Sequence, residues 1–304
     1  MRNQEKLNFV DYKGQRSYIN KIERDGIKEF FIDFHERNMK STSEVALELE
    51  KLNIIDGVSF YYNYIKEIKG LENLSQLKYL DLESNRIRKL QGLEKLVELR
   101  ELNLSENKIE EIRGLENLRK LEILNLEHNK VSKIEGLENL DNLRFLRLAY
   151  NNISEIRGLE NLENLEILYL YHNNISEIKG LSELKNLKEL YLDSNQIKNI
   201  NGLYNLENLT HLSLSNNKIK DIRGLGTLSK LISVDLGENL ISYLKILEIP
   251  QNLKSLGLDG NKISHLENIE RLKQIENVHL LRNPLDKGEL EKLGKHFDDY
   301  IHKI

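Results

Sequence analysis

Apolar positions repeat along most of the chain with a single period of 22 residues. Counted from an asparagine in each period, apolar residues lie 8, 5 and 3 places before it and 2, 5, 8 and 11 places after it. The asparagines in this register are Asn63, Asn85, Asn107, Asn129, Asn151, Asn173, Asn195, Asn217, Asn239, Asn261 and Asn283. A unit of this length cannot bury its apolar side chains by itself. The pattern therefore predicts units that stack on their neighbours around one continuous core.

The spacing within a unit predicts its local structure. The segment before the asparagine alternates with period 2, which indicates a short strand, and stacked copies running in one direction form a parallel sheet. The rest of the unit must return to the start of the next strand. This leaves space for irregular segments or a 3₁₀ turn, but not for a long α-helix.

The framework also contains a column of asparagines and a column of glycines. An asparagine amide both donates and accepts hydrogen bonds, so we expect the asparagines to satisfy buried backbone groups of successive turns. Glycine lies seven places after the asparagine in eight successive units, from Gly70 to Gly224, where we expect a positive φ or a close backbone approach. In later units Ile246 and Asn268 replace this glycine and Pro250 replaces a leucine, which predicts a changed path near Ile246.

The start of the chain departs from this frame and is expected to cap it. Residues 1–54 contain strand patterns separated by the turn sequences KGQ and RDG. A helix is predicted at 41–52, where Ser41 and Glu44 are spaced for a capping box. A small independent binding module is the alternative role for this segment.

The repeats and the end of the chain complete the predicted organisation. Residues 55–282 are read as a solenoid of ten 22-residue units, and residues 283–304 as a helical C-terminal cap. The helical pattern there consists of Leu290, Leu293, Phe297 and Ile301.

The repeated motif L-x-x-L-x-L-x-x-N-x-I-x-x-I-x-G-L-x-x-L, carried by residues 58–285, resembles the 22-residue class of leucine-rich repeats. That class includes the leucine-rich regulatory subunit of type-one protein phosphatase and the bacterial internalins. The resemblance implies an α/β fold: a right-handed solenoid with a concave parallel β-sheet, short 3₁₀ or irregular convex segments, and caps at both ends. It also implies a family that mostly binds other proteins on the concave face. The matching letters are all framework, so they do not identify a partner.

The strand positions that the framework leaves free predict a binding surface. Residues six, four and two places before each asparagine project from the sheet, and several large apolar side chains gather there. With strands about 4.8 Å apart, they form one predicted patch of about 15 Å along the solenoid, with Tyr150 at the strand edge. The members from the strands are Ile123, Phe145, Ile167, Tyr169, Tyr171 and Tyr191.

The predicted face has a net negative charge, whereas the rest of the chain has a net positive charge. The face has one base, Arg147, and eight acids, while the rest of the chain has 44 bases and 41 acids. Its acids are Asp81, Glu83, Glu101, Glu127, Glu189, Asp193, Asp235 and Asp259. An aromatic centre surrounded by acids is typical of a protein interface. We therefore predict a protein partner with basic and apolar surface, with Arg147, Glu127 and Asp193 among the binding residues. The alternative is that tyrosines simply suit strands and acids keep an exposed sheet soluble.

The remaining charges are expected to pair with one another. Basic residues lie just before the glycine column, and glutamates lie three residues further along. Mutual pairing is the simpler interpretation, and binding of an acidic surface is the alternative. The bases are Lys69, Arg113, Arg157, Lys179 and Arg223, and the glutamates are Glu72, Glu94, Glu116, Glu138 and Glu160.

Composition narrows the possible functions. The chain has no cysteine, which excludes disulfides, thiolate metal sites and cysteine nucleophiles. A net charge of −4 argues against a protein built for nucleic acid or anionic membranes. No catalytic constellation, metal site or cofactor motif is found. We expect a monomeric, non-enzymatic binding protein of the cytoplasm, with no nucleic-acid or membrane partner.

Two functional hypotheses remain. The phosphatase-subunit resemblance suggests, by analogy, a regulator of an enzyme. The internalin resemblance suggests a structural scaffold or a secreted or surface adhesin whose signal or anchor has been removed.

Overall fold

The computed structural model describes residues 9–24, 27–52, 55–245, 248–267 and 270–293. The chain forms two compact units, residues 1–147 and residues 148–304. They are called unit 1 and unit 2.

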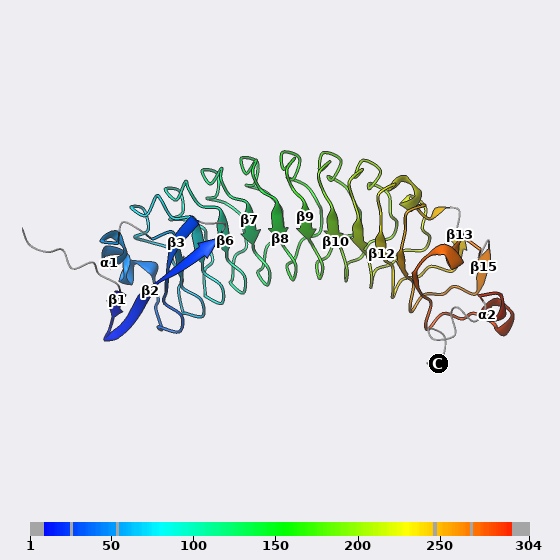
Figure 1. Cartoon of the computed structure of the whole chain (residues 1–304), viewed down its shortest axis with the longest axis horizontal. Helices are drawn as coiled ribbons and strands as arrows, with labels where there is room; N and C mark the ends of the chain where they lie inside the picture. Colours follow the sequence, from blue (N-terminus) through cyan, green and yellow to red (C-terminus); the bar gives the residue numbers. More distant parts are fainter. Residues whose placement is uncertain (1–8, 25–26, 53–54, 246–247, 268–269, 294–304) are drawn as a thin grey trace, which may run out of the picture. The chain divides into compact units, whose positions relative to one another are not determined.

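Unit 1 contains a parallel sheet of short strands, one from each repeat. Adjacent strands pair residue by residue at an offset of 22, so that Leu80 lies beside Leu102. Figure 1 shows these successive strands side by side. These strands are β4 (Gly57–Ser59), β5 (Tyr79–Asp81), β6 (Glu101–Asn103), β7 (Ile123–Asn125) and β8 (Phe145–Arg147). The middle residue of each is buried, which confirms the predicted alternation between core and outer face.

Unit 2 continues the same design. Its sheet contains β9 (Ile167–Tyr169), β10 (Glu189–Tyr191), β11 (His211–Ser213), β12 (Ser233–Asp235), β14 (Ser255–Gly257) and β16 (Asn277–His279). Short 3₁₀ segments, η2 (Leu225–Thr227) and η4 (Leu272–Gln274), lie on the return path. The parallel sheet and the short return segments confirm the predicted solenoid.

The path of the chain changes where the repeat frame loosens. The strands β13 (Tyr243–Lys245) and β15 (His265–Glu267) pair in parallel as a second, two-stranded sheet. Pro250, in a framework leucine position, is buried. Ile246 and Asn268 themselves lie outside the described residues.

The asparagine column forms the predicted hydrogen-bond ladder. The Asn173 side chain accepts a hydrogen bond from the Ile153 N–H at 2.9 Å. Its amide donates to the Leu148 carbonyl of the preceding turn at 2.9 Å and to the Leu170 carbonyl of its own turn at 3.1 Å. Each such asparagine therefore joins two turns and satisfies backbone groups that no strand could pair.

The glycine column has both properties expected of it. All eight glycines from Gly70 to Gly224 have positive φ. A Cβ built on Gly180 would lie 2.4 Å from the Ile156 carbonyl oxygen of the preceding turn. Glycine is therefore required there by backbone conformation and by contact between turns.

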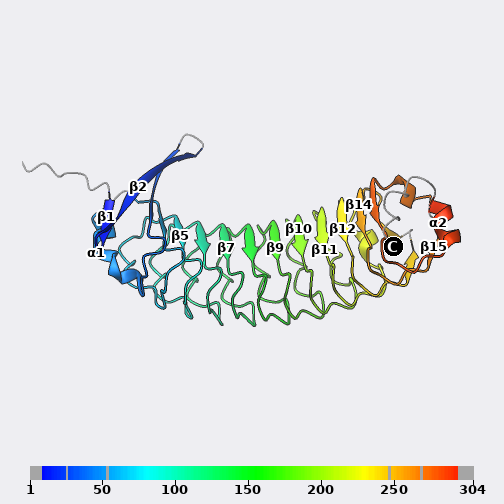
Figure 2. The ribbon, with the colours of Figure 1, turned by 90° about the horizontal axis from the view of Figure 1, so that it is seen from below.

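The N-terminal segment begins with the predicted strands, and the first three are joined by antiparallel pairing. β1 (Phe9–Tyr12), β2 (Gln15–Arg24) and β3 (Ile27–Asp33) pair in sequence, and β3 then pairs in parallel with β4. In Figure 2 the β2–β3 hairpin rises from the edge of the unit 1 sheet. The segment thus continues the sheet of the repeats.

The helix predicted at 41–52 is shorter than expected and interrupted. A 3₁₀ turn, η1 (Thr42–Glu44), is followed by α1 (Ala46–Glu50). The predicted capping box of Ser41 and Glu44 is present. The helix is broken because Val45 leaves helical geometry, with φ −127°, while the Thr42 hydroxyl bonds to the Lys69 N–H and carbonyl. These bonds hold the segment against the next turn.

Residues 27–52 are a further turn of the solenoid that lacks the sequence signature. The Phe34 N–H donates to the Ser59 carbonyl at 2.8 Å, the same bond that later repeats make. The Met39 N–H donates to the Asn63 side chain at 2.9 Å. Arg37 stands in the asparagine position, and its guanidinium donates to the Gln15 side chain at 2.9 Å. This turn is joined to the next by a spacing of 26 residues instead of 22.

The C-terminal segment contains the helix α2 (Lys287–Leu293). It begins soon after Asn283, as the sequence predicts. Phe297 and Ile301, the remaining members of the predicted helical pattern, lie outside the described residues.

Candidate functional site: an aromatic cluster on the sheet face

Four tyrosines and one histidine form a chain of ring contacts in unit 2. The Tyr169 and Tyr191 rings stack with centroids 4.7 Å apart and an interplanar angle of 6°. Tyr171 meets Tyr169 edge-on at 6.3 Å and Tyr150 edge-on at 5.4 Å. Tyr150 in turn stacks on His172 at 4.3 Å. These five residues are called the tyrosine cluster.

The repeat positions the tyrosine cluster. Tyr169 and Tyr191 are direct neighbours in the pairing of β9 and β10. They face outward because side chains alternate along a strand and the residues that precede them, Leu168 and Leu190, are buried. Stacking is therefore a consequence of the 22-residue offset. Neither ring is fully exposed, because each covers part of the other.

Tyr150 and His172 reach the cluster from the turn that follows each strand. Their φ angles are 53° and 52°, in the left-handed region that few non-glycine residues adopt. The same conformation recurs just before the asparagine throughout the repeats, as at Ser84, Glu106 and Ser194. Tyr150 is 39 % exposed, so it forms the accessible edge of the cluster. The sequence reading identified Tyr150 but missed His172, because it did not treat this turn column as part of the face.

Acidic groups surround the tyrosine cluster within unit 2. The Tyr191 hydroxyl donates to Glu189 Oε2 at 2.8 Å; burial, together with this bond and the Glu189 charge, raises the pKa of Tyr191. Asp193 accepts hydrogen bonds from the Ser215 hydroxyl, at 2.8 Å, and from the Ser213 hydroxyl. The outward strand positions of unit 2 also contain Asp235 and Asp259 but no lysine or arginine.

Burial affects the acids of both units. The pKa of Asp235 in unit 2 is raised, first by burial and then by the nearby charges of Asp193 and Asp259. In unit 1 the pKa of Asp81 is raised by burial and by the charges of Glu83 and Asp33. Each carboxylate is thus less stable in its charged form than it would be in water.

Of the other predicted site residues, Ile167 lies in β9 of unit 2 and is partly exposed, and the remaining four lie in unit 1. Ile123 and Phe145 are neighbours in the pairing of β7 and β8, and both are partly exposed. The Arg144 guanidinium lies 5.5 Å from the centre of the Phe145 ring. Arg147 is exposed and Glu127 is half-buried. That these residues form a single patch with Ile167 and the tyrosines stays a prediction.

One row of the predicted face is less exposed than expected. Ala149 and Ser105 lie two places before their asparagines but are 0 % and 5 % exposed. Both side chains are small and are covered by their neighbours. These two positions therefore contribute little to a surface, whereas Tyr171 and Ser215, at the same place in their repeats, are partly exposed.

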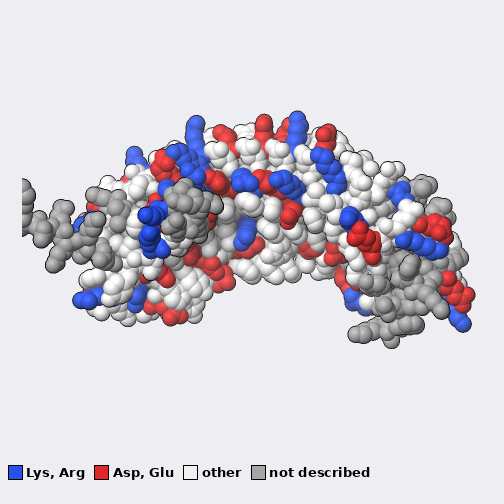
Figure 3. All heavy atoms as spheres, viewed as in Figure 1, with Lys and Arg blue, Asp and Glu red and all other residues white. Residues whose placement is uncertain are grey.

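Charges elsewhere on each unit are intermixed. Figure 3 shows acidic and basic side chains interspersed on the face that it displays. Lys120 pairs with Glu98 in unit 1 and Lys188 with Glu166 in unit 2, both at 2.6 Å. Such pairs near the surface contribute little to stability.

In the part of the chain that the structure describes, no group of three or more histidine, aspartate or glutamate side chains is placed to hold a metal ion. None of the described helices has the length and apolar character needed to cross a membrane.

Parallel strands that repeat every 22 residues, joined by an asparagine ladder and bearing an outward face of free residues, define a solenoid repeat protein. Comparison with known protein families also indicates a repeat protein. The family "Leucine Rich repeats (2 copies)" matches residues 97–139, 141–182, 163–205 and 207–248. The chain belongs to the leucine-rich repeat proteins.

Solved structures of bacterial leucine-rich repeat proteins are similar to this chain. The internalin InlF of Listeria monocytogenes is 29% identical, with 81% of this chain and 80% of that chain covered and a TM-score of 0.65. A leucine-rich repeat protein of Leptospira interrogans is 26% identical, covering 87% and 75%, with a TM-score of 0.74. Internalin C2 of Listeria monocytogenes is 31% identical, covering 63% and 83%, with a TM-score of 0.58. No curated protein sequence matches the chain.

Proposed function

We propose that this protein is a non-enzymatic interaction module that binds a protein partner on the outer face of its sheet. The observation that supports the proposal is the tyrosine cluster, in which four tyrosine rings and His172 touch in sequence on one face. Tyrosine suits an interface because it combines a large apolar ring with a polar hydroxyl and loses little side-chain entropy on binding. Rings that already contact one another lose still less side-chain entropy on binding.

The charge of the face suggests the chemistry of the partner. Glu189 and Asp193 flank the tyrosine cluster, and no lysine or arginine occupies the outward strand positions of unit 2. A partner that places basic residues around an apolar or aromatic element would neutralise these acids. We therefore propose a basic, partly apolar protein surface as the partner. By analogy with the phosphatase subunit alone, we further propose that the partner is an enzyme that the module regulates.

The proposed compartment is the cytoplasm, because the chain has no cysteine and needs no oxidising environment. The similarity to internalins favours a second candidate, a structural scaffold or a secreted or surface adhesin. Fractionation of the native cells, followed by detection with an antibody, separates the two. Recovery in the cytosol supports the first candidate, and recovery at the cell surface or in the medium supports the second.

The double variant Tyr169→Ala with Tyr171→Ala tests the binding surface. It removes the centre of the tyrosine cluster while leaving the buried Leu168 and Leu170 unchanged. We expect binding to the native partner to weaken at least tenfold, since central aromatic residues each contribute about 2 kcal/mol or more at interfaces. Quantitative pull-down from native cells identifies the partner, and calorimetry with the purified partner measures the change.

Tyr204→Ala is the matched control. Tyr204 is also in unit 2 and is 65% exposed, but it lies on the return segment and not on the sheet face. Its replacement should leave binding unchanged. Unaltered binding by a folded double variant would contradict the proposed surface.

A further inference from the structure

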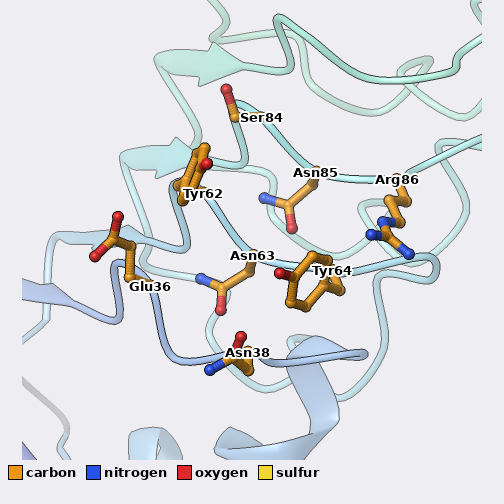
Figure 4. Close-up of a pocket in the computed structure, with 8 residues that line it drawn as sticks. All are labelled: Glu36, Asn38, Tyr62, Asn63, Tyr64, Ser84, Asn85 and Arg86. Atoms are coloured by element: carbon orange, nitrogen blue, oxygen red, sulfur yellow. The ribbon is translucent and has the colours of Figure 1, made fainter.

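An open pocket in unit 1 has no part in the proposed interface. It has a volume of about 380 Å³ and lies between three successive turns, at residues 36–38, 62–64 and 84–86. Figure 4 shows Glu36 and Arg86 at opposite sides of this pocket, with Tyr62 and Tyr64 between them. The volume is within the range of sites for small molecules.

The back of the pocket is rigid. Asn63 and Asn85 line it, and both belong to the asparagine ladder. The Asn63 amide donates to the Phe34 and Phe60 carbonyls, and the Asn85 side chain accepts from the Ile65 N–H at 2.9 Å. The pocket is therefore preformed, and a ligand would not need to order the backbone that surrounds it.

Arg86 is arranged to receive a carboxylate. Its guanidinium lies over the Tyr64 ring at 4.4 Å from the ring centre, which fixes the plane of the group. Stacking uses the face of the guanidinium and leaves the N–H groups at its edge. Among the described residues, no acidic side chain pairs with Arg86 and no acceptor receives the N–H groups of its guanidinium. Such an edge fits a carboxylate through two parallel hydrogen bonds.

Glu36 offers the opposite charge at the other side. Its only ion-pair neighbour among the described residues is His35, at 3.7 Å, and that contact is ionic only when the histidine is protonated. The Glu36 side chain is 62 % exposed, so it can reach a bound cation.

Further polar groups line the space between the two charges. The side-chain amide of Asn38 and the hydroxyls of Tyr62 and Tyr64 make no hydrogen bond within the described part of the chain. Tyr62 and Tyr64 are 56% and 42% exposed, so their rings are also accessible. An amide and two phenols can donate to or accept from a peptide group, and the rings can pack against its aliphatic atoms.

We infer that this pocket binds a short zwitterionic peptide, with its free carboxylate on Arg86 and its free ammonium group on Glu36. Two strand spacings of about 4.8 Å separate the turn of Glu36 from the turn of Arg86. A free amino acid has its charges too close together to reach both sides at once, whereas a peptide of two or three residues spans the distance. The chemistry is distinct from that of the tyrosine cluster, which is proposed to receive basic groups of a folded partner.

Calorimetric titration of the full chain with a panel of Gly-Xaa dipeptides tests the inference. We expect at least one dipeptide with free ends to bind. Its N-acetylated and C-amidated forms should each bind about tenfold more weakly or worse, because each loses a charge-assisted contact. The absence of binding by every dipeptide at millimolar concentration, or equal affinity for the blocked forms, would overturn the inference.

Two variants assign the ends of the peptide. Arg86→Gln should weaken binding of the free dipeptide about tenfold but leave binding of the amidated form unchanged. Glu36→Gln should weaken binding of the free dipeptide about tenfold but leave binding of the N-acetylated form unchanged. Lys108→Gln is the matched control, since Lys108 occupies the position of Arg86 in the next repeat and does not line the pocket. An equal loss in this control would show that net charge, and not the pocket, governs binding. Circular dichroism checks that each variant is folded.

Discussion

Individual residues of the framework act by joining one turn to the next. The clearest case is the asparagine ladder, in which one side chain satisfies backbone groups in two turns. The glutamates near the glycine column have a similar role. The sequence predicts that they pair with the preceding bases. For Glu116 the Arg113 charge does lower the pKa, but the hydrogen bond from the Gly114 N–H is the larger cause. Glu94, Glu116, Glu138 and Glu160 accept hydrogen bonds from glycine N–H groups.

The bases instead pair with acids two places before them, as Arg157 does with Glu155 and Lys179 with Glu177. A glycine with positive φ directs its N–H outward, and the nearest carboxylate receives it. Residue spacing alone could not predict this outcome, because both partners are within reach of the glutamate.

The Asn173→Ala variant tests the ladder. Loss of the side chain leaves the Ile153 N–H and the Leu148 carbonyl without their partner in a buried position. We expect the free energy of unfolding to fall by about 1–3 kcal/mol, as measured by urea denaturation. Asn174→Ala is the control, because the next residue is exposed and should change stability by less than about 0.5 kcal/mol. Equal effects of the two substitutions would contradict the role assigned to the ladder.

At the scale of the element, the turn after each strand determines how closely the repeats can stack. The glycine column was predictable from the sequence because eight glycines recur at one spacing. Its two causes were not separable there, since positive φ and close approach both demand glycine. The structure separates them, because the distance between turns varies along the column.

A comparison of Gly180→Ala with Gly224→Ala measures the two causes. Both glycines have positive φ, but a Cβ would lie 2.4 Å from a carbonyl oxygen at Gly180 and 3.3 Å at Gly224. We expect Gly224→Ala to lower the free energy of unfolding by about 1 kcal/mol through backbone strain. Gly180→Ala should cost about 1–3 kcal/mol more through overpacking. Thermal and urea denaturation provide the measurement, and equal losses would show that backbone strain alone explains the column.

The capping turn near α1 should make the stability of unit 1 depend on pH. Burial acts to raise the pKa of Glu44, but hydrogen bonds from the Tyr12 hydroxyl, the backbone N–H groups of Lys40 and Ser41, and Lys13 together lower it to about 2. A lowered pKa means that the folded state favours the charged carboxylate. Its contribution is complete above the ordinary value of 4.5 and is lost as pH falls toward about 2.

We therefore expect Glu44→Gln to be less stable than the wild type at pH 6, with the difference narrowing as pH falls below 4.5. Urea denaturation at a series of pH values measures it. A difference that stays constant with pH would mean that Glu44 acts through packing and not through its charge.

At the scale of the whole molecule, sequence reasoning predicted the fold almost completely and the site only in part. One spacing recurs in ten repeats and predicts the strand, the buried core and the asparagine ladder of each. An error in interpreting one repeat would therefore not change the predicted fold. The turn formed by residues 27–52 was not predicted, because Phe34, Arg37 and Met39 stand in for the usual framework residues and the spacing is altered. The ring stacking of Tyr150 on His172 was not predicted either, because it depends on turn conformation and side-chain rotamers and not on the repeat.

The acidity of the sheet face should govern the rate of association with the proposed partner. Opposite charges accelerate encounter, and salt screens them. We expect Asp193→Lys to slow association severalfold at low salt and to reduce the salt dependence of the rate, measured by stopped-flow mixing with the purified partner. Glu207→Lys, which makes the same change at an exposed position on the return segment, should have a smaller effect. A faster association of the Asp193→Lys variant would indicate an acidic partner.

The pairing of β3 with β4 has a practical consequence for anyone who shortens this protein to its recognisable repeats. A chain starting at residue 55 would lose the Phe34 carbonyl and the Met39 N–H that the Asn63 side chain now binds. It would also uncover Phe60, whose ring is stacked on Phe34 at 5.4 Å. An open strand edge beside a bare aromatic ring invites a second copy to add itself there. The trimmed protein would therefore self-associate, and the added contacts would be mistaken for a natural oligomer.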